Sequence, residues 1–174
     1  GIQALHMIPG GNRLERLDAD REWLESRITV FFTGITHHSG MVNWQVIRRR
    51  LEGDPGTSLA LQEITESAGL CRRAVLSAES NAVGDALRSE WAARQRLAPE
   101  ICPPELTRLE SEALNAGALA FKACGAGGGG SVLIWHEPDA VGPVAQAIMT
   151  TAPGGILFPR GVAVDGCRVN ARMT

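Results

Sequence analysis

Alternating apolar and polar positions predict short strands in the first part of the chain. Residues 2–8 alternate loosely and end at Pro9-Gly10-Gly11, which is a turn signal, so residues 12–17 could pair with them as a hairpin. Residues 18–25 are charged and are expected to form a surface connection. Residues 28–32, Ile-Thr-Val-Phe-Phe, are β-branched or aromatic throughout, which is typical of a strand.

A helix is expected after this strand. Ser39 is a plausible N-cap for a helix that runs from about Met41 to Leu51. Val42, Val46 and Leu51 are expected on its inner face.

Apolar residues at three- and four-residue spacing predict three more helices. Pro99 and Pro103-Pro104 separate the second of them from the third. Gly117 suits the position just after the third helix, where the chain often turns into the left-handed region. The apolar faces run from Leu61 to Ala78, from Val83 to Trp91 and from Leu106 to Ala113.

The remaining third predicts two strands, a helix and further short strands. Residues 118–124 and 131–136 are apolar and flank a glycine-rich loop, and Pro138-Asp139 begins a helix that reaches about Met149. This order of elements predicts an α+β fold in which helices cover one face of an antiparallel sheet. The length of 174 residues favours a single domain over residues 1–174. Short strands are expected at 156–159, 161–164 and 167–172.

The run from Gly125 to Gly130 is the most unusual segment of the chain. Its four consecutive glycines lose much backbone entropy when they are ordered, so they suit a place where the backbone passes close to a ligand or to other backbone. A dinucleotide-binding loop would lead into a helix, whereas Ser131 begins a strand, and a Walker A loop would end in Gly-Lys-Ser/Thr. Neither familiar motif fits, and a flexible hairpin remains the plain alternative.

Composition excludes several classes of protein. A net charge of −2, a pI of about 6.1, four phenylalanines and no tyrosine disfavour binding to nucleic acid. The cysteines form no C-x-x-C pair, so a zinc site is not expected and the thiols are expected to be reduced. No apolar run could span a membrane and no signal peptide is evident, so a cytoplasmic location is expected.

Four segments resemble the GHMP kinases, which include galactokinase, homoserine kinase and mevalonate kinase. The segment 117–130 is similar to their third signature motif, and 31–39 resembles a Y-T-G-x-T-R-x-S strand and turn of the sugar-kinase branch. The segment 91–97 looks like the W-x-x-K-R-x-L helix, and 1–11 resembles the strand after the domain crossover. They occur in family order, and the nearest resemblance is to the D-glycero-D-manno-heptose kinases, near the fucokinases.

The resemblance implies a ferredoxin-like C-terminal domain of a two-domain enzyme. In the family, the N-terminal domain carries the nucleotide loop, the usual metal ligand and the catalytic acid, and no such motif is seen in this sequence. The expectation is therefore that this chain is the C-terminal half of an ATP-dependent kinase for a sugar or a sugar phosphate such as a heptose phosphate. ATP and Mg²⁺ are expected in the complete enzyme, the isolated chain is expected to be inactive, and its catalytic residues stay unassigned. The alternative is a non-catalytic ligand-binding or regulatory domain.

Specific residues carry these expectations. The resemblance places the glycine loop beside the phosphates of the nucleotide, through Gly125, Ala126, Gly127, Gly128, Gly129 and Gly130. It places five other residues near the substrate, and no residue is expected to bind a metal. His37 departs from the family pattern, which has arginine there, so a phosphate contact at this position is in doubt. The five substrate-proximal candidates are Thr33, Gly34, His37, Arg94 and Lys122.

Overall fold

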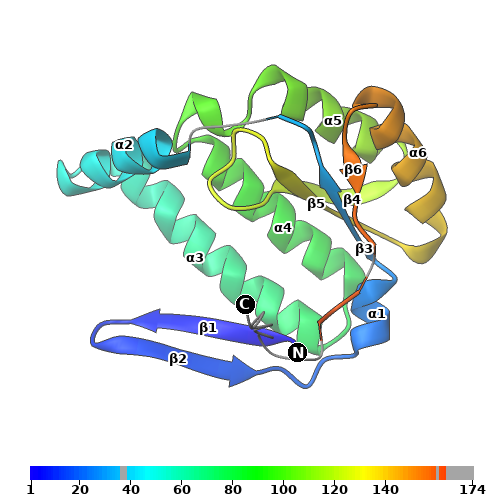
Figure 1. Cartoon of the computed structure of the whole chain (residues 1–174). Helices are drawn as coiled ribbons and strands as arrows, with labels where there is room; N and C mark the ends of the chain where they lie inside the picture. Colours follow the sequence, from blue (N-terminus) through cyan, green and yellow to red (C-terminus); the bar gives the residue numbers. More distant parts are fainter. Residues whose placement is uncertain (36–38, 160, 164–174) are drawn as a thin grey trace, which may run out of the picture.

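The computed structural model describes residues 1–35, 39–159 and 161–163. The chain forms two sheets, a two-stranded hairpin and a four-stranded sheet that helices cover (Figure 1). The elements in chain order are β1 (Gln3–Ile8), β2 (Gly11–Arg16), α1 (Arg21–Glu25), β3 (Ile28–Phe32), α2 (Ser39–Leu51), α3 (Pro55–Leu76), α4 (Ser80–Gln95), η1 (Pro99–Ile101), α5 (Pro104–Asn115), β4 (Ala118–Ala123), β5 (Ser131–His136), η2 (Pro138–Ala140), α6 (Val141–Thr151) and β6 (Ile156–Leu157).

The main sheet has the strand order β4-β5-β3-β6, and each pair of neighbours is antiparallel. Strand β3 is followed by helices, then by the β4–β5 pair, then by α6 and finally by β6. This is the strand-helix-strand-strand-helix-strand order of a ferredoxin-like domain. The predicted α+β, ferredoxin-like fold with an antiparallel sheet is therefore confirmed.

The main core lies between this sheet and the helices. Phe31 of β3 and Val132 of β5 are register partners, so their side chains lie on one face of the sheet, and both are fully buried. Leu109 of α5 and Ile148 of α6 pack into the same cluster. Trp91 of α4 joins it too, and its ring meets that of Phe121 edge-on with centroids 6.4 Å apart.

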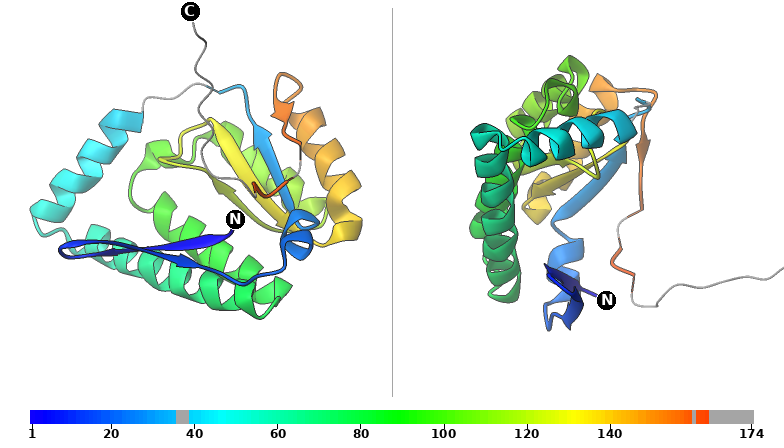
Figure 2. Two further views of the ribbon diagram at one scale, coloured as in Figure 1. Left: turned by 60° about the horizontal axis from the view of Figure 1, so that its bottom comes forward. Right: turned by 90° about the vertical axis from the view of Figure 1, so that its left-hand side faces the viewer.

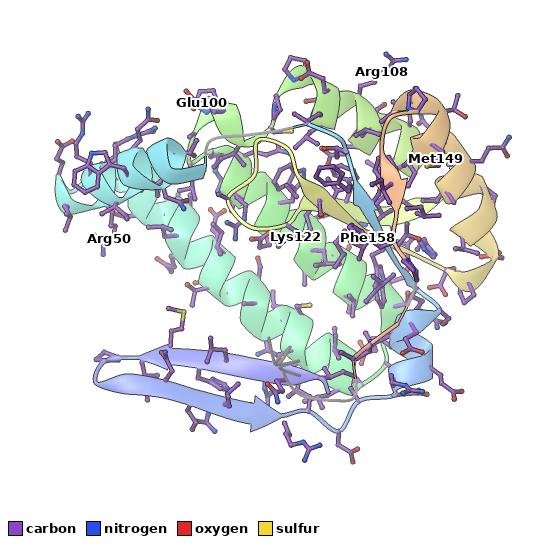
Figure 3. All side chains as sticks on the ribbon, in the orientation of Figure 1. Arg50, Glu100, Arg108, Lys122, Met149 and Phe158 are labelled. Atoms are coloured by element: carbon purple, nitrogen blue, oxygen red, sulfur yellow. The ribbon has the colours of Figure 1, made fainter. Side chains whose placement is uncertain are left out.

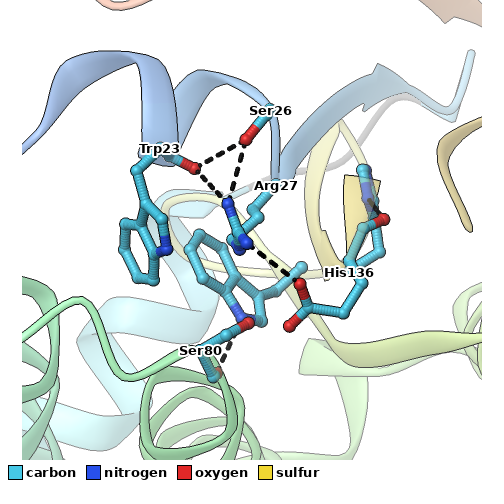
Figure 4. Close-up of polar contacts among 7 residues, drawn as sticks. Trp23, Ser26, Arg27, Ser80 and His136 are labelled. Carbon is cyan, nitrogen blue, oxygen red and sulfur yellow. Dashed lines mark hydrogen bonds and ion pairs between the residues drawn. The ribbon is translucent and has the colours of Figure 1, made fainter. Parts of the chain in front are cut away.

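A second cluster joins α1 to β5 and α4. The rings of Trp23 and Trp135 have centroids 5.4 Å apart, and the Trp135 indole N–H donates to the Ser80 carbonyl at 2.9 Å. The Arg27 guanidinium lies 4.9 Å from the centre of the Trp23 ring and pairs with Glu137 at 3.1 Å (Figure 4). These contacts fix the connection after the hairpin against the sheet.

The hairpin lies along α3, as the two views in Figure 2 also show. Its attachment is polar, because the Glu15 carboxylate of β2 accepts hydrogen bonds from Arg72 of α3, including one from Nε at 2.9 Å. His6 Nε2 lies 2.7 Å from the same carboxylate. Leu5 and Leu14 are register partners on the opposite face of the hairpin, where they are 56% and 65% exposed.

Three details differ from the sequence predictions. The predicted surface connection contains helix α1, whose first turn is capped by Asp20. Leu51 was expected to face inward but is 80% exposed, whereas Val42 and Val46 of the same helix pack against the core. Residues 161–163 are not a strand, and the predicted strand at 167–172 lies outside the described residues.

In the described part of the chain, Cys71, Cys102 and Cys124 are free thiols. None of the described helices is long and apolar enough to cross a membrane.

Gly155 sits where no side chain fits, so Gly155→Ala is expected to destabilise the fold. A Cβ there would lie 2.1 Å from Phe31 Cζ and 2.6 Å from the Phe32 carbonyl oxygen. Overpacking of this kind costs about 1–3 kcal/mol of unfolding free energy, measurable by urea denaturation. The control is Gly69→Ala on α3, which meets only a side-chain atom at 3.8 Å and should gain about 0.5–1 kcal/mol. Equal stability of Gly155→Ala and wild type would refute this packing.

The Glu15 contacts predict a loss of stability in acid. The hydrogen bonds from Arg72 and His6 lower the pKa of Glu15 from 4.5 to about 2. Because the folded pKa lies below the unfolded one, the stabilisation is present above pH 4.5 and is lost as the pH falls toward 2. Glu15→Gln should flatten the dependence of Tm on pH in that window, whereas the control Glu22→Gln, at an exposed site, should not. The same slope in all three proteins would contradict the assignment.

Candidate active site at the glycine loop

The glycine loop connects β4 to β5 in a conformation that suits glycine. Gly125, Gly127, Gly128 and Gly130 have φ angles of +74°, +83°, +83° and +70°. Side chains with a Cβ rarely adopt this left-handed region, because the Cβ approaches the neighbouring carbonyl oxygen. The sequence predicted a strand–loop–strand unit here, and the register of β4 against β5 confirms it.

The backbone of the loop packs against two other segments of the chain. The Gly128 N–H donates to the Ile101 carbonyl at 2.8 Å, and the Gly130 N–H donates to the Ile35 carbonyl at 2.9 Å. A Cβ on Gly127 would lie 2.8 Å from the Ile101 oxygen, and one on Gly129 would lie 2.8 Å from the Ile35 oxygen. Close backbone approach thus accounts for these two glycines without a ligand.

Thr33 and Gly34 lie next to the end of this loop. Thr33 is 5% exposed, and both its N–H and its hydroxyl donate to the Gly130 carbonyl at 2.9 Å. The same hydroxyl accepts the Ile35 N–H at 3.2 Å. Gly34 is exposed, with φ of +76°. The structure therefore brings both residues to the loop, and Thr33 braces it, whereas His37 lies outside the described residues.

The start of the loop keeps free donors. Within the described part of the chain, the N–H groups of Gly125 and Ala126 donate to no acceptor. Gly125 is exposed, and a Cβ added to it would meet nothing within 4 Å. Successive free N–H groups in a turn are a common way to bind an anion.

Lys122 and Arg94 come together on one carboxylate that the sequence analysis did not single out. Lys122, labelled in Figure 3, is the only lysine of the chain. Its Nζ lies 2.7 Å from Glu90 Oε2. Arg94 contacts Glu90 Oε1 through Nε at 2.7 Å, and its Nη1 donates to the Gly125 carbonyl at 3.5 Å. The spacing Val83, Leu87, Glu90 was the available signal, since it puts an acid on the apolar face of the helix.

Other regions of the molecule offer less chemistry. No group of three His, Cys, Asp or Glu side chains among residues 1–35, 39–159 and 161–163 could hold a metal ion. A cavity of about 420 Å³ lies over β3, β6 and α6, away from the loop. Its lining is mostly apolar and includes Val141, Ala145 and Phe158.

Substitutions in the loop should separate the packed glycines from the open one. Gly127→Ala must displace Ile101, and we expect it to cost about 1–3 kcal/mol of unfolding free energy, beyond the strain of its positive φ. Gly125→Ala has the same kind of φ but open space, so it should cost only about 1–2 kcal/mol. Urea denaturation of both variants tests this order, and a larger loss for Gly125→Ala would contradict the packing.

Comparisons with known proteins agree on one family. The family model for the C-terminal region of GHMP kinases matches residues 71–152. The chain is 34% identical over 111 residues to the bifunctional fucokinase/GDP-fucose pyrophosphorylase of Arabidopsis thaliana. This alignment covers 64% of this chain and 10% of that protein. It is 25% identical over 115 residues to the D-glycero-alpha-D-manno-heptose 7-phosphate kinase of Campylobacter jejuni. This alignment covers 66% of this chain and 33% of that kinase.

The solved structures extend the likeness to most of the chain. The mevalonate kinase of L. major, in complex with R-mevalonate, superimposes with a TM-score of 0.75 at 15% identity. That match covers 90% of this chain and 47% of the mevalonate kinase, and at this identity it shows the shared fold alone. The aligned regions thus span less than half of each of these relatives. Residues 71–152 thus match the C-terminal domain of the GHMP kinases, and most of the chain shares the fold of a mevalonate kinase.

Proposed function

We propose that this chain is the C-terminal part of an ATP-dependent kinase that phosphorylates a hydroxyl group of a sugar or a sugar phosphate. The names of the two curated relatives support this substrate class, since one is a fucokinase and the other a heptose 7-phosphate kinase. The chain spans only a fraction of each, so the proposal includes an N-terminal kinase domain that completes the active site.

The observation that carries the proposal is the open start of the glycine loop beside the lone lysine. Phosphoryl transfer depends on positioning and on stabilising negative charge more than on covalent chemistry. The free N–H groups of Gly125 and Ala126 and the ammonium of Lys122 are donors of the kind that phosphate oxygens accept. Lys122 is three residues before Gly125, so strand β4 delivers these donors to one end of the sheet.

ATP and Mg²⁺ belong to the proposed complete enzyme, where ATP supplies the phosphoryl group and Mg²⁺ neutralises its negative charge. In the described part of this chain, the loop start and Lys122 fit a phosphate, and no side-chain cluster fits a metal. We therefore expect the metal ligand and the catalytic acid on the N-terminal domain. It follows that residues 1–174 alone should release no ADP.

The test is ADP release from Mg-ATP by this chain combined with the N-terminal domain of its own protein. We expect turnover with a sugar or sugar phosphate from a panel that includes fucose and heptose 7-phosphate, and none with mevalonate. Lys122→Met should then lower kcat/KM by about tenfold or more, because it removes a cation from the phosphate region. The matched control is Arg108→Met, which removes an exposed cation from α5.

Two results would count against the proposal. If no sugar in the panel elicits ADP release, the kinase function is rejected. If a phosphorylated sugar nevertheless raises the Tm of this chain, it stabilises the native state by mass action. That combination would support the alternative of a non-catalytic ligand-binding domain.

A further inference from the structure

Glu90 is a buried acid on the face of α4 that meets strand β4. The residue is only 7% exposed, although it carries a carboxylate. Removing a carboxylate from water costs several kcal/mol unless opposite charges and hydrogen bonds replace the lost solvation. Its partners, rather than solvent, therefore determine what this acid does.

Each oxygen of the Glu90 carboxylate holds a different cation. Oε1 accepts from Arg94, one helical turn further along α4, and Oε2 faces the Lys122 ammonium from β4 at 2.7 Å. The Lys122 and Arg94 side chains are 20% and 25% exposed, so both reach the surface while Glu90 stays beneath them. The group carries one net positive charge at this surface.

Lys122 and Arg94 differ in how many of their hydrogen-bond donors remain free for a ligand. Arg94 uses its guanidinium on Glu90 and on the Gly125 carbonyl, so it ties the helix to the start of the glycine loop. An ammonium has three donors, and within the described residues Glu90 is the one acceptor that faces Lys122. Lys122 therefore keeps donors for a ligand, and Arg94 serves mainly to hold the loop.

We infer that Glu90 is a positioning residue, which holds the Lys122 ammonium and, through Arg94, the start of the glycine loop in the arrangement that a phosphate-bearing ligand meets. This inference rests on the proposed kinase function, because that function supplies the ligand. The physical gain is pre-organisation: the flexible stem of a lysine costs less entropy to order on binding when a fixed carboxylate already orders it.

The inference is testable because simple electrostatics and positioning predict opposite effects when the charge of Glu90 is removed. Glu90→Gln keeps the shape of the side chain but removes its charge, so the surface gains positive charge. Charge alone would then favour a phosphate and raise kcat/KM. Positioning predicts the reverse, since Lys122 and Arg94 lose the anion that holds them.

The first experiment uses the 174-residue chain without any ligand and measures amide hydrogen exchange. In Glu90→Gln we expect exchange at Gly128 and Gly130 to become about tenfold faster, with little change at Ile134 in the core of β5. Arg94→Gln, which leaves Glu90 paired with Lys122, should show the same local effect. The control Glu63→Gln breaks the ion pair between Glu63 of α3 and Arg96, the C-cap residue of α4, and should leave the loop unchanged. Unchanged exchange at the loop, or an equal rise at Ile134, would overturn the inference.

The second experiment separates positioning from general stability in the assembled kinase. Glu90→Gln should lower kcat/KM about as much as Lys122→Met, and the double variant should be no worse than Lys122→Met alone. If the fold-losses in kcat/KM of the two single variants multiply in the double variant, or if Glu90→Gln raises kcat/KM, the role assigned to Glu90 is overturned. If wild type shows no kinase activity, the proposed function fails, while the exchange measurement still decides whether Glu90 holds the loop.

Discussion

The structure of the candidate site depends on backbone packing at the glycine loop. Gly127 and Gly129 lack the Cβ atoms that would collide with the carbonyls of Ile101 and Ile35. That close approach lets the neighbouring N–H groups of the loop reach the same two carbonyls. Because Ile101 lies in η1 and Ile35 follows β3, the loop ties together segments that are far apart in the sequence. The free donors at its start are thereby held by a rigid anchor rather than by a mobile hairpin.

A second constraint is electrostatic and comes from the ion pairs of Glu90 on helix α4. The Glu90 carboxylate is buried at the contact of α4 with β4, where Lys122 and Arg94 compensate its charge, and Arg94 also contacts the Gly125 carbonyl. The same interaction therefore stabilises the helix–strand contact and orients the lysine. A site built in this way loses function and local order together when the carboxylate is removed, and the comparison of loop and core exchange separates these effects.

Much of the fold followed from local patterns. The strand at residues 28–32 was predicted with its observed bounds, because β-branched and aromatic side chains suit a pleated and half-buried surface. The hairpin followed from alternation around a glycine turn. Leu51 was placed wrongly because it lies nine residues after Val42, which at about 100° per residue puts it on the opposite side of the helix. Its helix carries a second apolar stripe, through Trp44, which is 62% exposed.

The site was less predictable, since its interactions join residues that are distant in sequence. The glycine run indicated close approach, but nothing local identified Ile101 as the neighbour, because prolines interrupt the periodic pattern there. Glu90 was missed for a similar reason: its partner Lys122 is on another element, and only the packing of α4 on β4 brings them together. An acid at a core-facing helical position was the one available clue, and it did not reveal which cation would meet it.

The chemical groups of the described residues determine which steps this domain could support in the proposed kinase and which would need the facing domain. A glycine loop with free N–H groups and a fixed lysine can stabilise negative charge, but neither supplies a carboxylate that could bind a metal or act as a general base. Glu90 does not fill that role, because both of its oxygens face cations and it is buried beneath them. In the proposed kinase this domain would therefore contribute charge and geometry, while proton transfer and metal binding would come from the facing domain. The affinity of this domain for phosphate and the chemical step of the complete enzyme should then respond to different substitutions.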